Sequence, residues 1–212
     1  MAKILLGVTG SVAAIKTPDL VEALLQQGHH VKVIATAHSL YFFDRSSLPE
    51  NCLYTDKDEW PRQNTGKTWQ RCDEVLHIDL RRWAELLVIA PLDANTLAKL
   101  ANGICDNCLT CVWRAWDLGR PLLLAPAMNT LMWEHPHTVR HLVHLAQLFG
   151  ITIEPSLEAD QLADLLGKQT VSPLRLVGPI SKKLACGDTG QGAMAELPDI
   201  LNSIQGILTA PS

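Results

Sequence analysis

The chain has 212 residues, of which 47% are hydrophobic and 19% are charged. This length and balance are typical of one globular domain with a substantial core. With 18 basic and 22 acidic residues, the formal net charge is −4, and the basic residues are scattered. Proteins that bind nucleic acid usually present a basic patch, so the composition argues against such a partner.

Nothing in the sequence resembles a targeting or membrane-spanning segment. The apolar run within Ala2–Gly7 is too short for a signal peptide, and no later run reaches the roughly 18 apolar residues of a membrane helix. The six cysteines are therefore expected to be reduced thiols rather than disulfide bridges. We expect a cytoplasmic protein without a membrane partner.

The first 35 residues predict a strand, a helix and a second strand. Residues 3–8 are a short aliphatic run, and after a turn the apolar residues between positions 12 and 25 recur at helical spacing. Gly28 is suited to end that helix, and His30–Ala35 alternates as a strand. Such a unit implies a parallel sheet.

The rest of the chain continues this alternation after a polar, irregular stretch over residues 46–68. Short strands are predicted at 75–78, 86–90, 122–125 and 151–153, and helices at 95–100, 108–116, 139–149, 156–168 and 197–208. Alternating strands and helices predict an α/β fold: a single-domain, doubly wound parallel sheet in a three-layer α/β/α sandwich of the flavodoxin or Rossmann type.

In an open parallel sheet, ligands bind beyond the carboxyl ends of the strands. Four loops are expected there, at residues 9–12, 35–38, 91–96 and 126–129. The first contains Gly10 and Ser11 but no G-x-G-x-x-G pattern, so it favours a single phosphate over a pyrophosphate. Ordinary helix capping uses the same residue types, and both interpretations stay open at this point.

Four segments of the chain resemble the homo-oligomeric flavin-containing cysteine decarboxylases. Residues 126–133 read P-x-M-N-x-x-M-W, which is similar to the substrate-recognition motif of that family. Three further segments resemble sequences of the same family: residues 7–14 (GVTGSVAA), 77–84 (HIDLRRWA) and 185–196 (ACGDTGQGAMAE). The occurrence of the segment 77–84 together with the segment 185–196 is typical of the branch that acts on 4'-phosphopantothenoylcysteine.

The resemblance implies FMN-dependent decarboxylation of that compound to 4'-phosphopantetheine in coenzyme A synthesis. A carboxylate next to a carbon that bears only an amide has no place for the electron pair that departing CO₂ leaves behind. Oxidation of the carbon that bears sulfur creates the missing electron sink, and this is the chemistry that a flavin supplies. After CO₂ has left, the reduced flavin returns its hydride to the product, and FMN is regenerated.

The family also implies a role for individual residues. His77 is expected to be the base, because imidazole exchanges protons near neutral pH. Asn129 is expected to bind the substrate carboxylate through its neutral amide, a contact that ordinary helix capping can accompany. Cys186 is expected to donate the final proton from a glycine-rich flap at about 179–196.

The remaining implied positions contact the substrate or the cofactor. Expected substrate contacts are Lys183, Ala185 and Met194, with Lys183 suited to the phosphate. Expected FMN contacts are Gly10, Ser11, Val12, Thr36, Ala37, His38, Asp93, Ala94, Asn95, Thr96 and Ala127.

The resemblance further implies a homotrimer with FMN at the subunit interface and His77 contributed by a neighbouring protomer. The single flavoprotein domain is expected to carry an insertion at about 155–178. Two alternatives within the family remain, a regulatory subunit similar to phosphatase inhibitors and a peptidyl-cysteine decarboxylase. The presence of His77, Asn129 and Cys186, without a long acidic tail, favours a decarboxylase over the regulatory subunit.

Three other patterns are weaker candidates. The Cys105-x-x-Cys108-x-x-Cys111 spacing resembles an iron–sulfur tract, but no Cys-Pro follows at the required offset. Residues 66–68 resemble the end of a P-loop without a strand before it. Histidines 135, 137, 141 and 144 lack a carboxylate that would complete a ligand set. We expect no metal.

Overall fold

The computed structural model describes residues 1–61, 68, 70, 71, 73–154, 156–170, 172–183 and 189–210. Its centre is a six-stranded sheet in the order β3-β2-β1-β4-β5-β6, in which all neighbours are parallel. The strands are β1 (Lys3–Val8), β2 (His30–Ala35), β3 (Leu53–Tyr54), β4 (Leu86–Leu92), β5 (Leu122–Pro126) and β6 (Leu174–Leu176).

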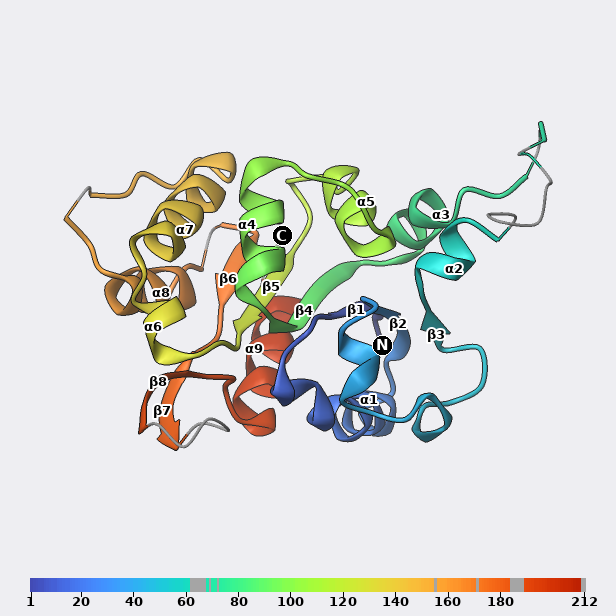
Figure 1. Ribbon diagram of the computed structural model, residues 1–212, viewed down its shortest axis with the longest axis horizontal. Helices are drawn as coiled ribbons and strands as arrows, with labels where there is room; N and C mark the ends of the chain where they lie inside the picture. Colours follow the sequence, from blue (N-terminus) through green and yellow to red (C-terminus); the bar gives the residue numbers. More distant parts are fainter. Residues whose placement is uncertain are drawn as a thin grey trace.

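Helices cover both faces of this sheet (Figure 1). One face packs against the short helix η1 (Val12–Lys16), α1 (Thr17–Gln26) and α9 (Leu197–Thr209). The other packs against α3 (Leu76–Trp83), α4 (Ala94–Asn102), α5 (Cys108–Arg114), α7 (Pro136–Leu148) and α8 (Ala159–Gly167). The predicted doubly wound α/β/α sandwich is confirmed.

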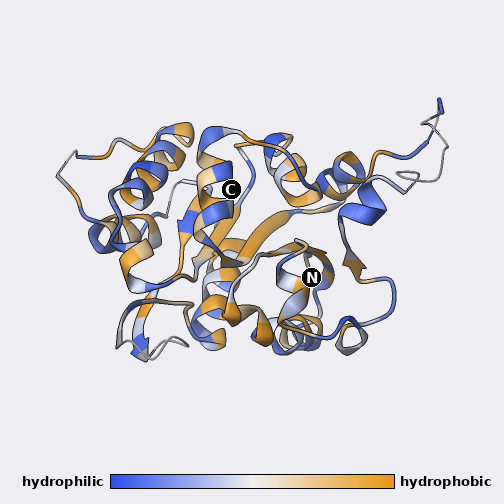
Figure 2. Cartoon of the chain, in the orientation of Figure 1, coloured by the Kyte–Doolittle hydropathy of each residue, from blue (hydrophilic) through white to orange (hydrophobic). Residues whose placement is uncertain are grey.

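The two cores follow from the two-residue period of a strand. In β1, Leu6 faces the core beneath α1 and α9, whereas the preceding Leu5 faces the core beneath α3, α4 and α5. Because a helix layer lies on each side, all seven residues of β4 are buried. Figure 2 shows the resulting hydrophobic strands between helices whose outer faces are hydrophilic.

Smaller elements connect the sandwich. Between β2 and α3 lie η2 (Ser39–Tyr41), η3 (Arg45–Ser47), β3 and α2 (Asp56–Glu59), so the predicted irregular stretch contains a short edge strand and a helical turn. Beyond β5 lies the one-turn helix α6 (Thr130–Trp133). The antiparallel hairpin β7 (Ile180–Lys183) and β8 (Thr189–Ala193) lies outside the main sheet.

Two strand predictions are wrong. Residues 75–78 do not form a strand, because His77 and Ile78 belong to helix α3. The run Val75-Leu76-His77-Ile78 is too short for its periodicity to separate strand from helix, and the buried Leu80 one turn later anchors the helix instead. Residues 151–153 are not a strand either, although Ile151 and Ile153 pack against the core.

The segment expected to be an insertion contains α8 and β6, and β6 pairs with β5 as an edge strand of the main sheet. Helix α8 also contacts α6, because Nε1 of Trp133 in α6 donates to Asp160 Oδ1 at 2.7 Å. The segment therefore supports the region around α6. Among the described helices, none is long and apolar enough to cross a membrane.

Candidate active site

Two loops are joined where β1 and β4 end side by side. The hydroxyl of Thr9 donates to the carbonyl of Pro91 at 2.9 Å and accepts from the backbone N–H of Asp93 at 2.7 Å. The direction of the sheet order reverses between these strands, since β2 lies beyond β1 and β5 lies beyond β4. This is the position at which open α/β sheets bind ligands.

Asp93 holds both loops with one carboxylate. Its Oδ2 accepts from the N–H of Gly10 at 2.9 Å, and its Oδ1 accepts from the N–H of Thr96 at 2.6 Å as the N-cap of α4. Asp93 is therefore a helix cap and a loop tie at once. Thr96 is buried, and its N–H is already bonded to Asp93.

Gly10 brings the loop after β2 close to the first loop. A Cβ on Gly10 would lie 2.8 Å from the Cβ of His38, so no larger residue fits without movement. Thr36 is buried, whereas Ala37 and His38 are exposed. These three predicted cofactor residues lie beside the first loop but do not line the cavity described next.

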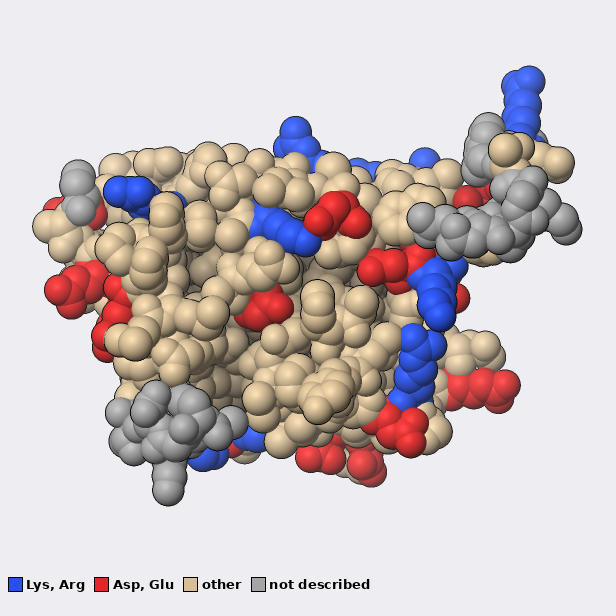
Figure 3. Space-filling model, viewed as in Figure 1, with Lys and Arg blue, Asp and Glu red and all other residues tan. Residues whose placement is uncertain are grey.

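A cavity of about 530 Å³ lies at this sheet edge. It brings together seven of the predicted cofactor residues and two of the predicted substrate residues. They are Gly10, Ser11, Val12, Asp93, Ala94, Asn95 and Ala127, with Asn129 and Met194. Figure 3 shows that much of the viewed face is uncharged and that an acidic side chain lies near its middle.

The composition of the cavity wall fits a flavin. Val12, Ile15 and Met132 are 45%, 56% and 53% exposed, and all three line this one cavity, so its wall presents a cluster of large apolar side chains. A planar aromatic ring would cover such side chains. Ser11 caps η1 by accepting from the N–H of Ala13 at 3.4 Å, so polar groups and a helix start lie in the same wall.

Asn129 is both a helix cap and a residue of the cavity wall. Its Oδ1 accepts from the N–H of Leu131 at 2.9 Å as the N-cap of α6, and the residue also lines the cavity. The cap determines the orientation of the side chain, because the acceptor oxygen has to face the first turn of the helix.

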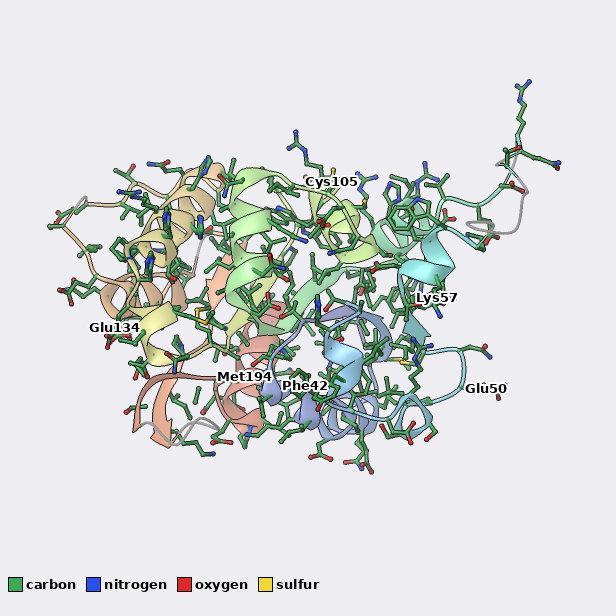
Figure 4. The ribbon with its side chains drawn as sticks, in the orientation of Figure 1. Phe42, Glu50, Lys57, Cys105, Glu134 and Met194 are labelled. Atoms are coloured by element: carbon green, nitrogen blue, oxygen red, sulfur yellow. The ribbon has the colours of Figure 1, made fainter. Side chains whose placement is uncertain are left out.

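The β7–β8 hairpin packs directly against the loop that contains Asn129. The backbone N–H of Met128 donates to the carbonyl of Gly192 at 2.9 Å, and Gly192 has a φ of +135°. A Cβ on Gly192 would clash with the carbonyl oxygen of Met128. Met194 follows β8 and is buried, and Figure 4 shows it well inside the molecule.

An ion-pair cluster that the sequence analysis missed connects the hairpin to η1. Glu196 accepts from Lys16 Nζ and from Lys182 Nζ, each at 2.7 Å. The hydrogen bonds from Lys16 and then Lys182 lower the pKa of the Glu196 carboxyl to about 2. Both lysines line the cavity. Adjacent strand residues face opposite sides, so Lys182 was as reasonable a candidate as Lys183.

The side chain of Lys183, and Ala185 and Cys186 entirely, lie outside the described residues. Gly66 and Lys67 of the P-loop-like pattern lie outside them as well.

His77 does not line the cavity. It lies near the start of α3, which with α2 is at one end of the long axis, whereas α6 and the β7–β8 hairpin are at the other (Figure 1). Its Nδ1 is 2.6 Å from Oε1 of Glu59, a second residue that the sequence analysis missed. No spacing pattern in the sequence links positions 59 and 77.

The other patterns show no metal-binding geometry. Burial raises the pKa of the Cys111 thiol to about 11 and also raises that of Cys108, while Cys105 is exposed before α5 and far from Met194 (Figure 4). The rings of His135, His137 and His141 stack on one another. Within the described ranges, no three His, Cys, Asp or Glu side chains are arranged to hold a metal ion.

Comparison with known proteins agrees with this geometry. A rice protein named phosphopantothenoylcysteine decarboxylase is 49% identical over 203 residues, which cover 95% of this chain and 78% of the relative. A solved structure of a PPC decarboxylase mutant complexed with pantothenoylaminoethenethiol is 46% identical, with a TM-score of 0.78 and 96% coverage of both chains.

A second solved structure, the FMN binding protein AtHal3, is 45% identical and covers all of this chain and 98% of its own, again with a TM-score of 0.78. Residues 1–209 match the flavoprotein family. With this agreement in sequence and fold, the chain belongs to the flavoprotein family and resembles the phosphopantothenoylcysteine decarboxylases.

Proposed function

We propose that this protein is an FMN-dependent carboxy-lyase that decarboxylates 4'-phosphopantothenoylcysteine to 4'-phosphopantetheine in coenzyme A biosynthesis. The observation that carries this proposal is the single cavity wall that joins the Gly10–Ala13 loop, the Asn129 loop and the β8 end of the flap. It is supported by 49% identity to a decarboxylase of that name and by a similar structure complexed with pantothenoylaminoethenethiol.

The cavity would hold FMN through the loops at residues 10–13 and 93–95 and through Ala127, with apolar side chains against the ring. Bound FMN supplies the reversible oxidation of the carbon that bears sulfur, and this makes CO₂ a good leaving group. The apolar wall limits water around the reacting carbon, and so strengthens each polar contact there.

Asn129 orients the substrate carboxylate. Its N-cap bond to Leu131 holds the side chain in one rotamer, so the amide meets the substrate without reorganisation. A neutral amide positions the carboxylate without the strong ground-state stabilisation that a lysine or arginine would give.

His77 accepts a proton from the substrate as the oxidation begins, and Cys186 returns a proton to the product from the flap. Because His77 lies away from the cavity of its own chain, we place it in the site of a neighbouring protomer within a homotrimer. The same proposal locates the enzyme in the cytoplasm.

The test is a flavin spectrum combined with a CO₂ assay on the wild type and on His77→Asn. We expect a yellow wild-type protein that releases CO₂ from phosphopantothenoylcysteine faster than from a peptide ending in cysteine. The variant should keep its flavin and lose at least about 100-fold in turnover. A colourless wild type that does not bind added FMN would contradict the proposal.

A further inference from the structure

One carboxylate holds both the helix and the ring of His77. Oε2 of Glu59 accepts from the backbone N–H of His77 at 2.9 Å, and Oε1 lies 2.6 Å from its ring Nδ1. Helix α3 has no cap from its own N-cap residue, Val75. Glu59 therefore supplies a negative group at the start of α3 and at the same time sets the angle of the imidazole.

The arrangement determines which ring nitrogen is available. A carboxylate at Nδ1 stabilises a proton on that nitrogen and leaves the lone pair on Nε2. Nε2 of His77 makes no hydrogen bond to any residue that the structure describes, and the side chain is 24% exposed. The Glu59 side chain is only 5% exposed. The exposed nitrogen is thus the basic one.

Glu59 is itself held in place by hydrogen bonds within α2 and between α2 and α5. Its backbone N–H donates to the carbonyl of Thr55 at 3.3 Å within α2, and α2 is tied to α5 because Asp56 Oδ1 accepts from the N–H of Cys108 at 2.9 Å. The thiol of Cys108 is buried next to this contact. The backbone bond within α2 and the bond from Asp56 to α5 thus restrain the short helix that carries Glu59.

We infer that Glu59 is a positioning residue, which fixes His77 as the tautomer with a proton on Nδ1 and a free lone pair on Nε2, and aims that lone pair away from its own subunit. The inference rests on the proposed function for the role of His77 as a base. Glu59 does not contact the substrate, and it acts through the imidazole alone.

The sharpest variant is Glu59→Gln, which keeps the size of the side chain. The two N–H groups face different oxygens of Glu59, and a glutamine replaces one of these oxygens with an NH2 donor, which opposes one of the two N–H groups. The turnover number should fall between about 10-fold, as for other orienting partners, and about 10,000-fold, as when a catalytic histidine loses the carboxylate that holds its tautomer, whereas flavin content and KM should change little. The matched control is Asp79→Asn on α3, a 52% exposed carboxylate that lies 4.0 Å from Arg82. It should behave like wild type.

A second readout does not depend on turnover. Nitrogen-15 NMR of labelled histidines, with the His77 signals identified by their loss in His77→Asn, reports the tautomer in protein without substrate. We expect Nδ1–H with a bare Nε2 in wild type and in Asp79→Asn, and protonated Nε2 in at least part of the Glu59→Gln molecules. Protonated Nε2 in wild type, or an unchanged tautomer in Glu59→Gln, would overturn the inference.

A double-variant cycle separates a positioning role from a merely structural one. If Glu59 acts through His77, then adding Glu59→Gln to His77→Asn should not slow flavin reduction by substrate any further. Independent, multiplying losses would overturn the inference. A wild type without decarboxylase activity would refute the proposed function alone, because the spectra still decide whether Glu59 sets the tautomer.

Discussion

Several residues bond to backbone groups and also line the cavity. Asp93 caps α4 and ties down Gly10, while Asn129 caps α6 and forms part of the cavity wall. A sequence pattern cannot separate a cap from a ligand contact, because both need the same small polar side chain. Here one side chain is in both places, so under the proposed function we expect a substitution at either position to change stability and binding together.

In the described part of the flap, Gly192 combines a positive φ with a close backbone contact. Its φ of +135° and its closeness to the Met128 carbonyl both exclude a side chain. We expect Gly192→Ala to cost about 1–3 kcal/mol of unfolding free energy and to raise KM for the substrate. Urea denaturation and steady-state kinetics would measure the two effects.

Gly206 in α9 is the matched control for that change. Nothing lies within 4 Å of a Cβ placed on it, so Gly206→Ala should stabilise the protein by about 0.4–1 kcal/mol through helix propensity and reduced freedom of the unfolded chain. Equal effects of the two substitutions would show that the Met128 contact is unimportant.

At the scale of elements, the hairpin is fastened to η1 by Glu196 between Lys16 and Lys182. The pKa of Glu196 is lowered to about 2 from an ordinary value of 4.5, and this direction determines how the stability depends on pH. The stabilisation is fully present above the ordinary pKa, and it is lost as the pH falls through the folded-state pKa. We expect the difference in urea midpoint between wild type and Glu196→Gln to shrink as the pH falls below 4.5 and to vanish near pH 2.

The matched control is Asp164→Asn in α8, whose pair with Lys168 is 3.5 Å long and whose side chain is 77% exposed. Isolated exposed pairs contribute little, so this variant should differ from wild type by a small amount at every pH. A Glu196→Gln difference that persists unchanged down to about pH 2 would contradict the assigned ion pair.

For the whole molecule, the central fact is that His77 and the cavity lie apart in one chain. A homotrimer with shared sites would restore activity when two inactive variants are mixed. We expect His77→Asn and Asn129→Asp trimers to be inactive alone, because a carboxylate at position 129 keeps the cap but repels the substrate carboxylate.

Unfolding and refolding a 1:1 mixture should then recover about a quarter of wild-type CO₂ release. Each shared site takes His77 from one protomer and Asn129 from another at random, so both residues are intact in about one site in four. The trimer itself would be measured by sedimentation. Recovery that stays at zero, in trimers shown to be mixed, would place both residues of each site in one chain.

Much of the fold and of the cavity was predictable from the sequence by itself. The aliphatic runs of β1, β4 and β5, the helix patterns between them and the polar residues after each strand are local properties, and parallel strands align their carboxyl ends. Nine of the predicted cofactor and substrate residues therefore line one cavity.

The tertiary structure alone decided the rest. The run at 75–78 became helical because Leu80 is buried and Glu59 caps the helix start. The pairing of Glu59 with His77, and of Glu196 with two lysines, joins residues whose separation carries no periodic signal. Periodicity shows which side of an element is buried, but the partner across a long separation is determined only when the elements pack.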